Sequence, residues 1–108
     1  FEKRIYSYPI QPDGSVRPSD VRVFFDPPTP HKADPDGMCA DAEGNLYFTM
    51  SGGCWVANSS GVNLGLIPTP EFCSNVTFGG ADGKTLFLTC DKKVYSLRMK
   101  VQGALFLP

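Results

Sequence analysis

The stretch that decides the fold runs from position 44 to 49 and reads Gly-Asn-Leu-Tyr-Phe-Thr. A second stretch, 84–89, reads Lys-Thr-Leu-Phe-Leu-Thr, and Leu86 follows Leu46 by 40 positions. Both are rich in aromatic and β-branched residues, and both come directly after an acidic residue followed by glycine, which signals a turn. The two stretches therefore predict two copies of one β unit.

The repetition extends beyond these two stretches. Segment 35–41, Pro-Asp-Gly-Met-Cys-Ala-Asp, aligns with 74–80, Ser-Asn-Val-Thr-Phe-Gly-Gly, at an offset of 39. A third copy, 3–8, aligns with 92–97 at an offset of 89, about two units. A period of roughly 40–45 residues with four short strands is typical of a propeller blade. The sequence predicts an all-β chain built of antiparallel, four-stranded β-propeller blades.

The chain contains 11 Gly and 10 Pro. These residues interrupt the sequence so often that no segment shows the apolar periodicity of an amphipathic helix. The expected strands are 4–9, 20–25, 37–41, 46–50, 54–58, 63–67, 74–79, 85–90, 93–99 and 104–107. They divide into a half blade over 4–25, a complete blade over 37–67 and a further blade over 74–107. A propeller closes with at least about four blades. We therefore expect a partial propeller of roughly two and a half blades, the C-terminal part of a larger ring.

The net charge and the length of the apolar runs argue against two classes of partner. The 108 residues carry 10 Lys+Arg and 11 Asp+Glu, a formal net charge of −1. This balance argues against a nucleic-acid binder and against attraction to an anionic membrane surface. No apolar run approaches the roughly 20 residues that a membrane-spanning helix needs. The sequence thus predicts no nucleic-acid partner and no membrane partner, and it leaves the cellular compartment open.

The four cysteines contain no Cys-x-x-Cys pair, and His31 is the only histidine, so a zinc site of the thiolate type is a poor fit. If 73–79 and 85–90 form a hairpin, Cys73 and Cys90 lie nearly opposite each other. The pair then has two interpretations, a disulfide or two small buried hydrophobic side chains.

Two side chains carry the candidate chemistry. The repeat places Asp36 and Asn75 at the same position, where the first strand of a blade begins at the central channel. Carboxylate and amide oxygens from successive blades suit a hard divalent cation. Each residue has a structural alternative: Pro-Asp-Gly is a common turn, and Asn75 can cap its own backbone. His31, on the loop that leads into Asp36, is either a substrate contact or an exposed loop residue.

Segment 34–47, Asp-Pro-Asp-Gly-Met-Cys-Ala-Asp-Ala-Glu-Gly-Asn-Leu-Tyr, resembles the metal-binding segment of the regucalcin/gluconolactonase family. The resemblance continues through Phe78-Gly79-Gly80 and 82–87, Asp-Gly-Lys-Thr-Leu-Phe, and it covers about positions 4–101. It implies a six-bladed propeller with a divalent ion, calcium or zinc, in the central channel. It also implies hydrolysis of a sugar lactone.

Transferred residue by residue, the resemblance assigns one metal ligand, Asp36, which would also serve as the catalytic carboxylate that takes a proton from water. Asn75 and His31 are the expected substrate contacts. The family's other ligands, a Glu and Asn residues, belong to earlier blades and are absent from this sequence. The expected function is metal-dependent hydrolysis of a sugar lactone such as gluconolactone, with this chain supplying part of the active site.

A non-enzymatic alternative follows from the number of blades. A truncated propeller module without activity would associate with itself or pair with a partner chain, and three copies of about two blades would complete a six-bladed ring. A third alternative is one piece of a split enzyme whose second chain bears the remaining ligands.

Overall fold

The computed structural model describes residues 3–27 and 34–106. Its elements, in chain order, are β1 (Ile5–Ser7), η1 (Pro18–Asp20), β2 (Arg22–Phe25), β3 (Met38–Ala40), β4 (Leu46–Met50), β5 (Gly53–Ala57), β6 (Asn63–Pro68), β7 (Cys73–Gly79), β8 (Thr85–Cys90), β9 (Lys93–Arg98) and η2 (Ala104–Phe106). The two η elements are single 3₁₀ turns, and the described residues form no α-helix. Nothing helical in these two ranges is long and apolar enough to cross a membrane.

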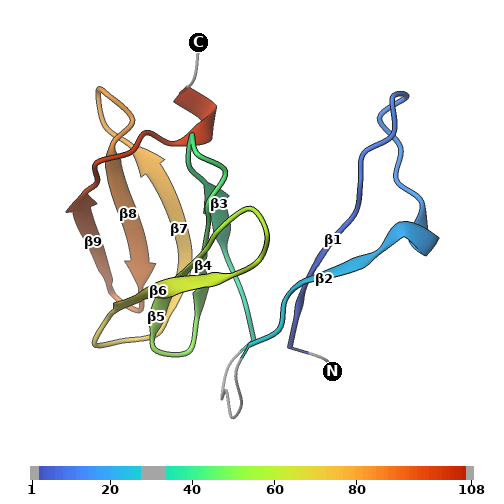
Figure 1. Ribbon diagram of the computed structural model, residues 1–108. Helices are drawn as coiled ribbons and strands as arrows, with labels where there is room; N and C mark the ends of the chain where they lie inside the picture. Colours follow the sequence, from blue (N-terminus) through green and yellow to red (C-terminus); the bar gives the residue numbers. More distant parts are fainter. Residues whose placement is uncertain (1–2, 28–33, 107–108) are drawn as a thin grey trace.

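The strands form three antiparallel sheets in which each strand pairs with its neighbour in sequence. The sheets have the orders β1-β2, β3-β4-β5-β6 and β7-β8-β9. Figure 1 shows β3 and β7 next to each other, with β9 at the far edge of its sheet. The backbone N–H of Gly37, just before β3, donates to the carbonyl of Ser74 in β7 at 3.0 Å. Successive meanders that meet at their first strands are the arrangement of neighbouring propeller blades, so the predicted fold class is confirmed.

Strand β4 shows why the sheets stack. Side chains alternate along a strand, and a strand with both faces covered is apolar almost throughout. Phe48 and Met50 face the β1-β2 sheet, and Phe48 meets Phe25 edge-on with ring centroids 4.8 Å apart. Tyr47 faces the third sheet and meets Phe78 at 5.2 Å, again edge-on. The middle sheet is therefore packed on both sides, as a blade inside a ring must be.

The chain after β9 differs from the sequence-based expectation. A fourth strand was expected over 104–107, but Ala104–Phe106 is a 3₁₀ turn, and β7-β8-β9 has three strands. The preceding residues return instead to the neighbouring blade. The N–H of Ala42 donates to Gln102 at 2.7 Å, and the N–H of Gly103 donates to Gly83 at 2.9 Å. The backbone of the segment is thus already bonded to two turns and cannot extend the sheet beyond β9.

Glycine is required at position 103 for this path. A Cβ there would lie 2.5 Å from the side chain of Phe78, closer than two carbon atoms can approach without displacement. The absence of a side chain lets the C-terminal segment lie directly on β7, and so it connects the turn after β3 with the turn after β7.

The cysteine alternatives are resolved by the register. Cys73 and Cys90 are directly paired in the β7–β8 hairpin, both are fully buried, and they form a disulfide. Cys39 and Cys54 are free. Burial raises the pKa of Cys39 to about 11 and that of Cys54 to about 12. Both thiols therefore stay protonated near neutral pH in this structure, which makes them poor nucleophiles.

Candidate metal and substrate site

Asp36 precedes β3 by two positions, and β3 begins at the end of the sheets where the β4–β5 and β8–β9 turns also lie (Figure 1). Its backbone N–H donates to the carbonyl of Thr49 at 2.9 Å. The side chain is exposed, and among residues 3–27 and 34–106 no hydrogen bond or ion pair occupies its carboxylate. A carboxylate with a fixed backbone and uncommitted oxygens can accept an external ligand.

Asn75 contacts Gly37, the residue that follows Asp36. The backbone of Gly37 packs directly on Asn75, so closely that a Cβ at position 37 would lie 2.6 Å from the Asn75 Cα. The Asn75 Oδ1 accepts the N–H of Val76 at 2.9 Å. This is the backbone-capping role that the sequence offered as the alternative for Asn75. The amide nitrogen, with its two N–H donors, is still available to a ligand.

His31 lies outside the described residues, so its predicted substrate contact stays a prediction. Of the two candidate residues that the structure describes, Asn75 contacts Gly37, the residue after Asp36, and a joint role of the Asp36 and Asn75 side chains stays a prediction.

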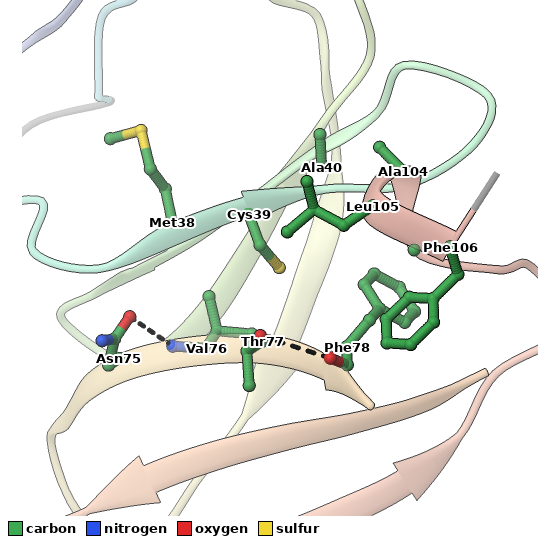
Figure 2. A pocket seen from close by; sticks show the side chains of 11 residues that line it. Met38, Cys39, Ala40, Asn75, Val76, Thr77, Phe78, Ala104, Leu105 and Phe106 are labelled. Carbon is green, nitrogen blue, oxygen red and sulfur yellow. Dashed lines mark hydrogen bonds between the residues drawn. The ribbon is translucent and has the colours of Figure 1, made fainter. Parts of the chain in front are cut away.

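A groove of about 390 Å³ runs between β3 and β7. Figure 2 shows Asn75 at one end and the η2 side chains Leu105 and Phe106 at the other. Apart from Asn75 and Thr77, its lining side chains are apolar or carry only the protonated thiol of Cys39: Met38, Cys39, Ala40, Val76, Phe78, Ala104, Leu105 and Phe106. Asp36 does not line the groove, so Asn75 is the candidate residue that borders it.

The donor atoms at this site are of the type that a hard cation prefers, but the described residues supply too few of them. Carboxylate and amide oxygens are the donors that calcium prefers, and zinc also accepts carboxylate. Within the described ranges no group of three or more His, Cys, Asp or Glu side chains is close enough to hold a metal ion. One carboxylate leaves most of an ion's hydration shell in place. A tight site at Asp36 therefore needs ligands beyond those that the described residues supply.

Thr49 is a residue of this site that the sequence analysis did not single out. It is fully buried in β4, and its Oγ1 accepts the N–H of Gly37 at 3.0 Å. The repeat contained a signal for it, because both copies end on threonine, Thr49 and Thr89. Only the pairing of β3 with β4 shows what that hydroxyl contacts.

Asp41, the other acidic side chain of the motif, is structural. It is 2% exposed, and its carboxylate accepts four hydrogen bonds of 2.9–3.0 Å: from the N–H of Glu43, from the N–H and side-chain amide of Asn45, and from the hydroxyl of Tyr47. Burial opposes ionisation, but these hydrogen bonds outweigh it and hold the pKa of Asp41 below its usual value. Asp41 therefore stabilises the turn between β3 and β4 rather than binding a ligand.

This lowered pKa predicts a pH dependence of stability. A carboxyl group whose pKa is lower in the folded state stabilises the fold above its unfolded pKa, near 4, and loses that contribution as the pH falls through the folded value. We expect Asp41→Asn to cost about 2 kcal/mol at neutral pH and less at pH 3. The measurement is urea unfolding of the full-length gene product at both pH values. Glu43→Gln, a change at the exposed neighbour, is the control, and identical pH profiles for Asp41→Asn and wild type would contradict the assignment.

The fold and the site together define the chain as a partial β-propeller that presents an oxygen ligand at the start of an inner strand. Residues 1–92 match the sequence profile of the SMP-30/Gluconolactonase/LRE-like region. The chain belongs to this family.

Known relatives agree with this assignment. The chain is 38% identical over 71 residues to a gluconolactonase of Zymomonas mobilis subsp. mobilis, an alignment that covers 64% of this chain and 20% of that protein. Among solved structures, a gluconolactonase of Xanthomonas campestris aligns with a TM-score of 0.69 at 36% identity, over 82% of this chain and 28% of that one.

Two further structures match at a TM-score of 0.81 over 94% of this chain. One is a putative gluconolactonase, 28% identical, of which 33% is covered. The other is a luciferin-regenerating enzyme, of which 40% is covered; at 22% identity it shows the fold alone. The chain thus spans between about a fifth and two fifths of the relatives it matches.

Proposed function

We propose that the full-length gene product hydrolyses a sugar lactone in a metal-dependent reaction, and that this chain contributes Asp36 as one ligand of the metal. The observation that carries the proposal is the Asp36 carboxylate, which is exposed and uncommitted among the described residues, two positions before the inner strand β3. Membership of the family and similarity to proteins named gluconolactonase support the lactone as substrate.

Asp36 and Asn75 have different roles in the proposed reaction. A divalent ion, when bound, polarises the substrate carbonyl and lowers the pKa of a coordinated water. Asp36 supplies a hard oxygen ligand, and its second carboxylate oxygen can accept the proton of the attacking water. The Asn75 side-chain amide can donate to a lactone oxygen, since its own Oδ1 is bonded to Val76. The apolar groove beyond Asn75 limits the water that reaches this side of the bound substrate.

The test is removal of the metal. We expect chelation of the full-length gene product to lower its kcat/KM for gluconolactone at least about 100-fold, and calcium or zinc to restore it. The rate is measured by proton release at constant pH, with spontaneous lactone hydrolysis subtracted. Full activity after chelation would contradict metal dependence. A metal-replete protein that hydrolyses no lactone would contradict the proposed reaction.

A second candidate, an inactive module that associates with copies of itself, is favoured by the exposed apolar surface. Tyr8 and Val23, next to and in the β1-β2 sheet, are 43% and 50% exposed. Within the described ranges, no strand pairs with the outer edge of β9. Exposed sheet edges and apolar patches favour association.

If this chain is produced alone, as residues 1–108, we expect it to form oligomers in light scattering, because association covers the exposed edge and faces. Val23→Lys, which places a charge on the exposed face of β2, is expected to shift the population toward monomer. A wild-type chain that stays folded and monomeric at high concentration would remove this candidate.

A further inference from the structure

We propose that Thr49 is a positioning residue for the Asp36 ligand. The Thr49 hydroxyl accepts a hydrogen bond from the N–H of Gly37 and so fixes the backbone next to Asp36. This inference rests on the proposed metal-binding function of Asp36. It assigns to Thr49 a role in affinity for the ion, although Thr49 itself would not touch the ion.

The contact between Thr49 and the segment before β3 is unusually complete. Three strong bonds join them: Asp36 N–H to Thr49 O at 2.9 Å, Thr49 N–H to Gly37 O at 2.9 Å, and Gly37 N–H to Thr49 Oγ1 at 3.0 Å. The hydroxyl also points its donor at the Gly37 carbonyl, a weaker contact of 3.4 Å. Thr49 is 0% exposed and paired with Cys54 on its other side, so it is a rigid support.

The hydroxyl adds a side-chain bond to a segment that is otherwise held by backbone bonds to Thr49 and Ser74. Regular strand pairing begins only at Met38, so Asp36 and Gly37 lie just outside the ladder. Position 37 cannot carry a side chain that would brace the segment, because a Cβ there would collide with Asn75. Among the described residues, the Thr49 hydroxyl is the one side-chain group that bonds the Asp36–Gly37 backbone.

The same hydroxyl also takes part in the junction between blades. The N–H of Gly37 lies 3.0 Å from Thr49 Oγ1 and 3.0 Å from the carbonyl of Ser74, so one donor is shared between an acceptor in the middle sheet and one in the third sheet. Loss of the hydroxyl would leave the Gly37 N–H bonded to Ser74 alone, while the backbone bonds from Asp36 N–H to Thr49 O and from Thr49 N–H to Gly37 O would remain. The segment would then be held to its own sheet by backbone bonds only.

The threonine at the equivalent position of the next blade also contacts the start of an inner strand. Thr89, 40 positions after Thr49, directs its Oγ1 to the carbonyl of Asn75 at 3.5 Å and lies 3.3 Å from the Ser74 hydroxyl. A threonine at this position therefore contacts the start of the inner strand in both blades. In the middle blade the contact is shorter and Thr49 is fully buried, and there the threonine lies against the segment that carries Asp36.

Calorimetric titration of calcium, and separately of zinc, into the metal-free full-length gene product tests the proposal. Thr49→Val removes the hydroxyl and keeps the shape, and we expect it to weaken ion binding about 10- to 100-fold, as loss of groups that orient ligands does elsewhere. Thr49→Ser restores the hydroxyl and should bind within about threefold of wild type. Thr49→Ala replaces the valine variant if that variant does not fold.

Asp41→Asn is the matched control, because it removes buried hydrogen bonds at the opposite end of β3 without contacting Asp36. It should lower stability and leave ion affinity unchanged. Equal affinities for wild type and a folded Thr49→Val would overturn the positioning role while leaving the metal site intact. Equal losses in Thr49→Val and Asp41→Asn would also overturn it, since general destabilisation would then explain both. A wild-type protein that binds neither ion would overturn the proposed function and this inference together.

Discussion

Replacement of Asp36 by alanine is expected to lower kcat/KM for lactone hydrolysis by about two to three orders of magnitude in the full-length gene product. The change removes the carboxylate that is proposed to bind the metal and to take the proton from water. Asp36→Asn keeps one oxygen but loses the negative charge, so a smaller loss that excess metal partly reverses is expected. The measurement is initial rate against substrate at several metal concentrations.

Asp34→Ala is the control for this experiment. Asp34 is a second acidic residue two positions upstream, and it lies 4.0 Å from the amine of Lys3 in an exposed ion pair. Such pairs contribute little, so activity should stay near that of wild type. Equal rates for Asp36→Ala and wild type would remove Asp36 from catalysis and leave the family fold without an assigned active residue in this chain.

Loss of the Cys73–Cys90 disulfide is expected to have the largest effect on stability. The bond closes the open end of the β7–β8 hairpin, and its cysteines are 17 positions apart in the sequence. Constraining a loop of this length in the unfolded chain is worth about 3 kcal/mol. For a protein of a few hundred residues that corresponds to a decrease in Tm of roughly 6–12 °C. Thermal unfolding with and without reductant measures it.

The double variant Cys73→Ala/Cys90→Ala should show the lower Tm in both conditions, because no bond is left to reduce. Cys54→Ala is the matched control: it removes a buried thiol in the same core cluster, so its Tm should still fall when reductant is added. If reductant leaves the wild-type Tm unchanged while free thiols appear, the disulfide does not stabilise the fold.

The candidate residues could be selected from the sequence because the repeat makes their positions equivalent, but their contacts between blades could not. The repeat placed Asp36 and Asn75 at one position of the unit, and the structure packs Gly37 directly on Asn75. The choice between the two roles of Asn75 was not predictable. Whether its Oδ1 bonds to its own strand or to a ligand depends on a rotamer, and packing against Gly37 decides that rotamer rather than local sequence.

By itself, the sequence determined the unit from which this protein is built. Turn signals at Glu43-Gly44 and Asp82-Gly83 and strands of period 2 are short-range properties of the chain, so the all-β repeat could be read from residues a few positions apart. Tertiary structure alone decided the contacts between units. These are the disulfide, the return of the C-terminal segment to Ala42, and the bond from Thr49 to Gly37 across 12 positions. Each depends on the register in which distant strands pair, and a shift of one residue would turn every side chain to the other face of its sheet.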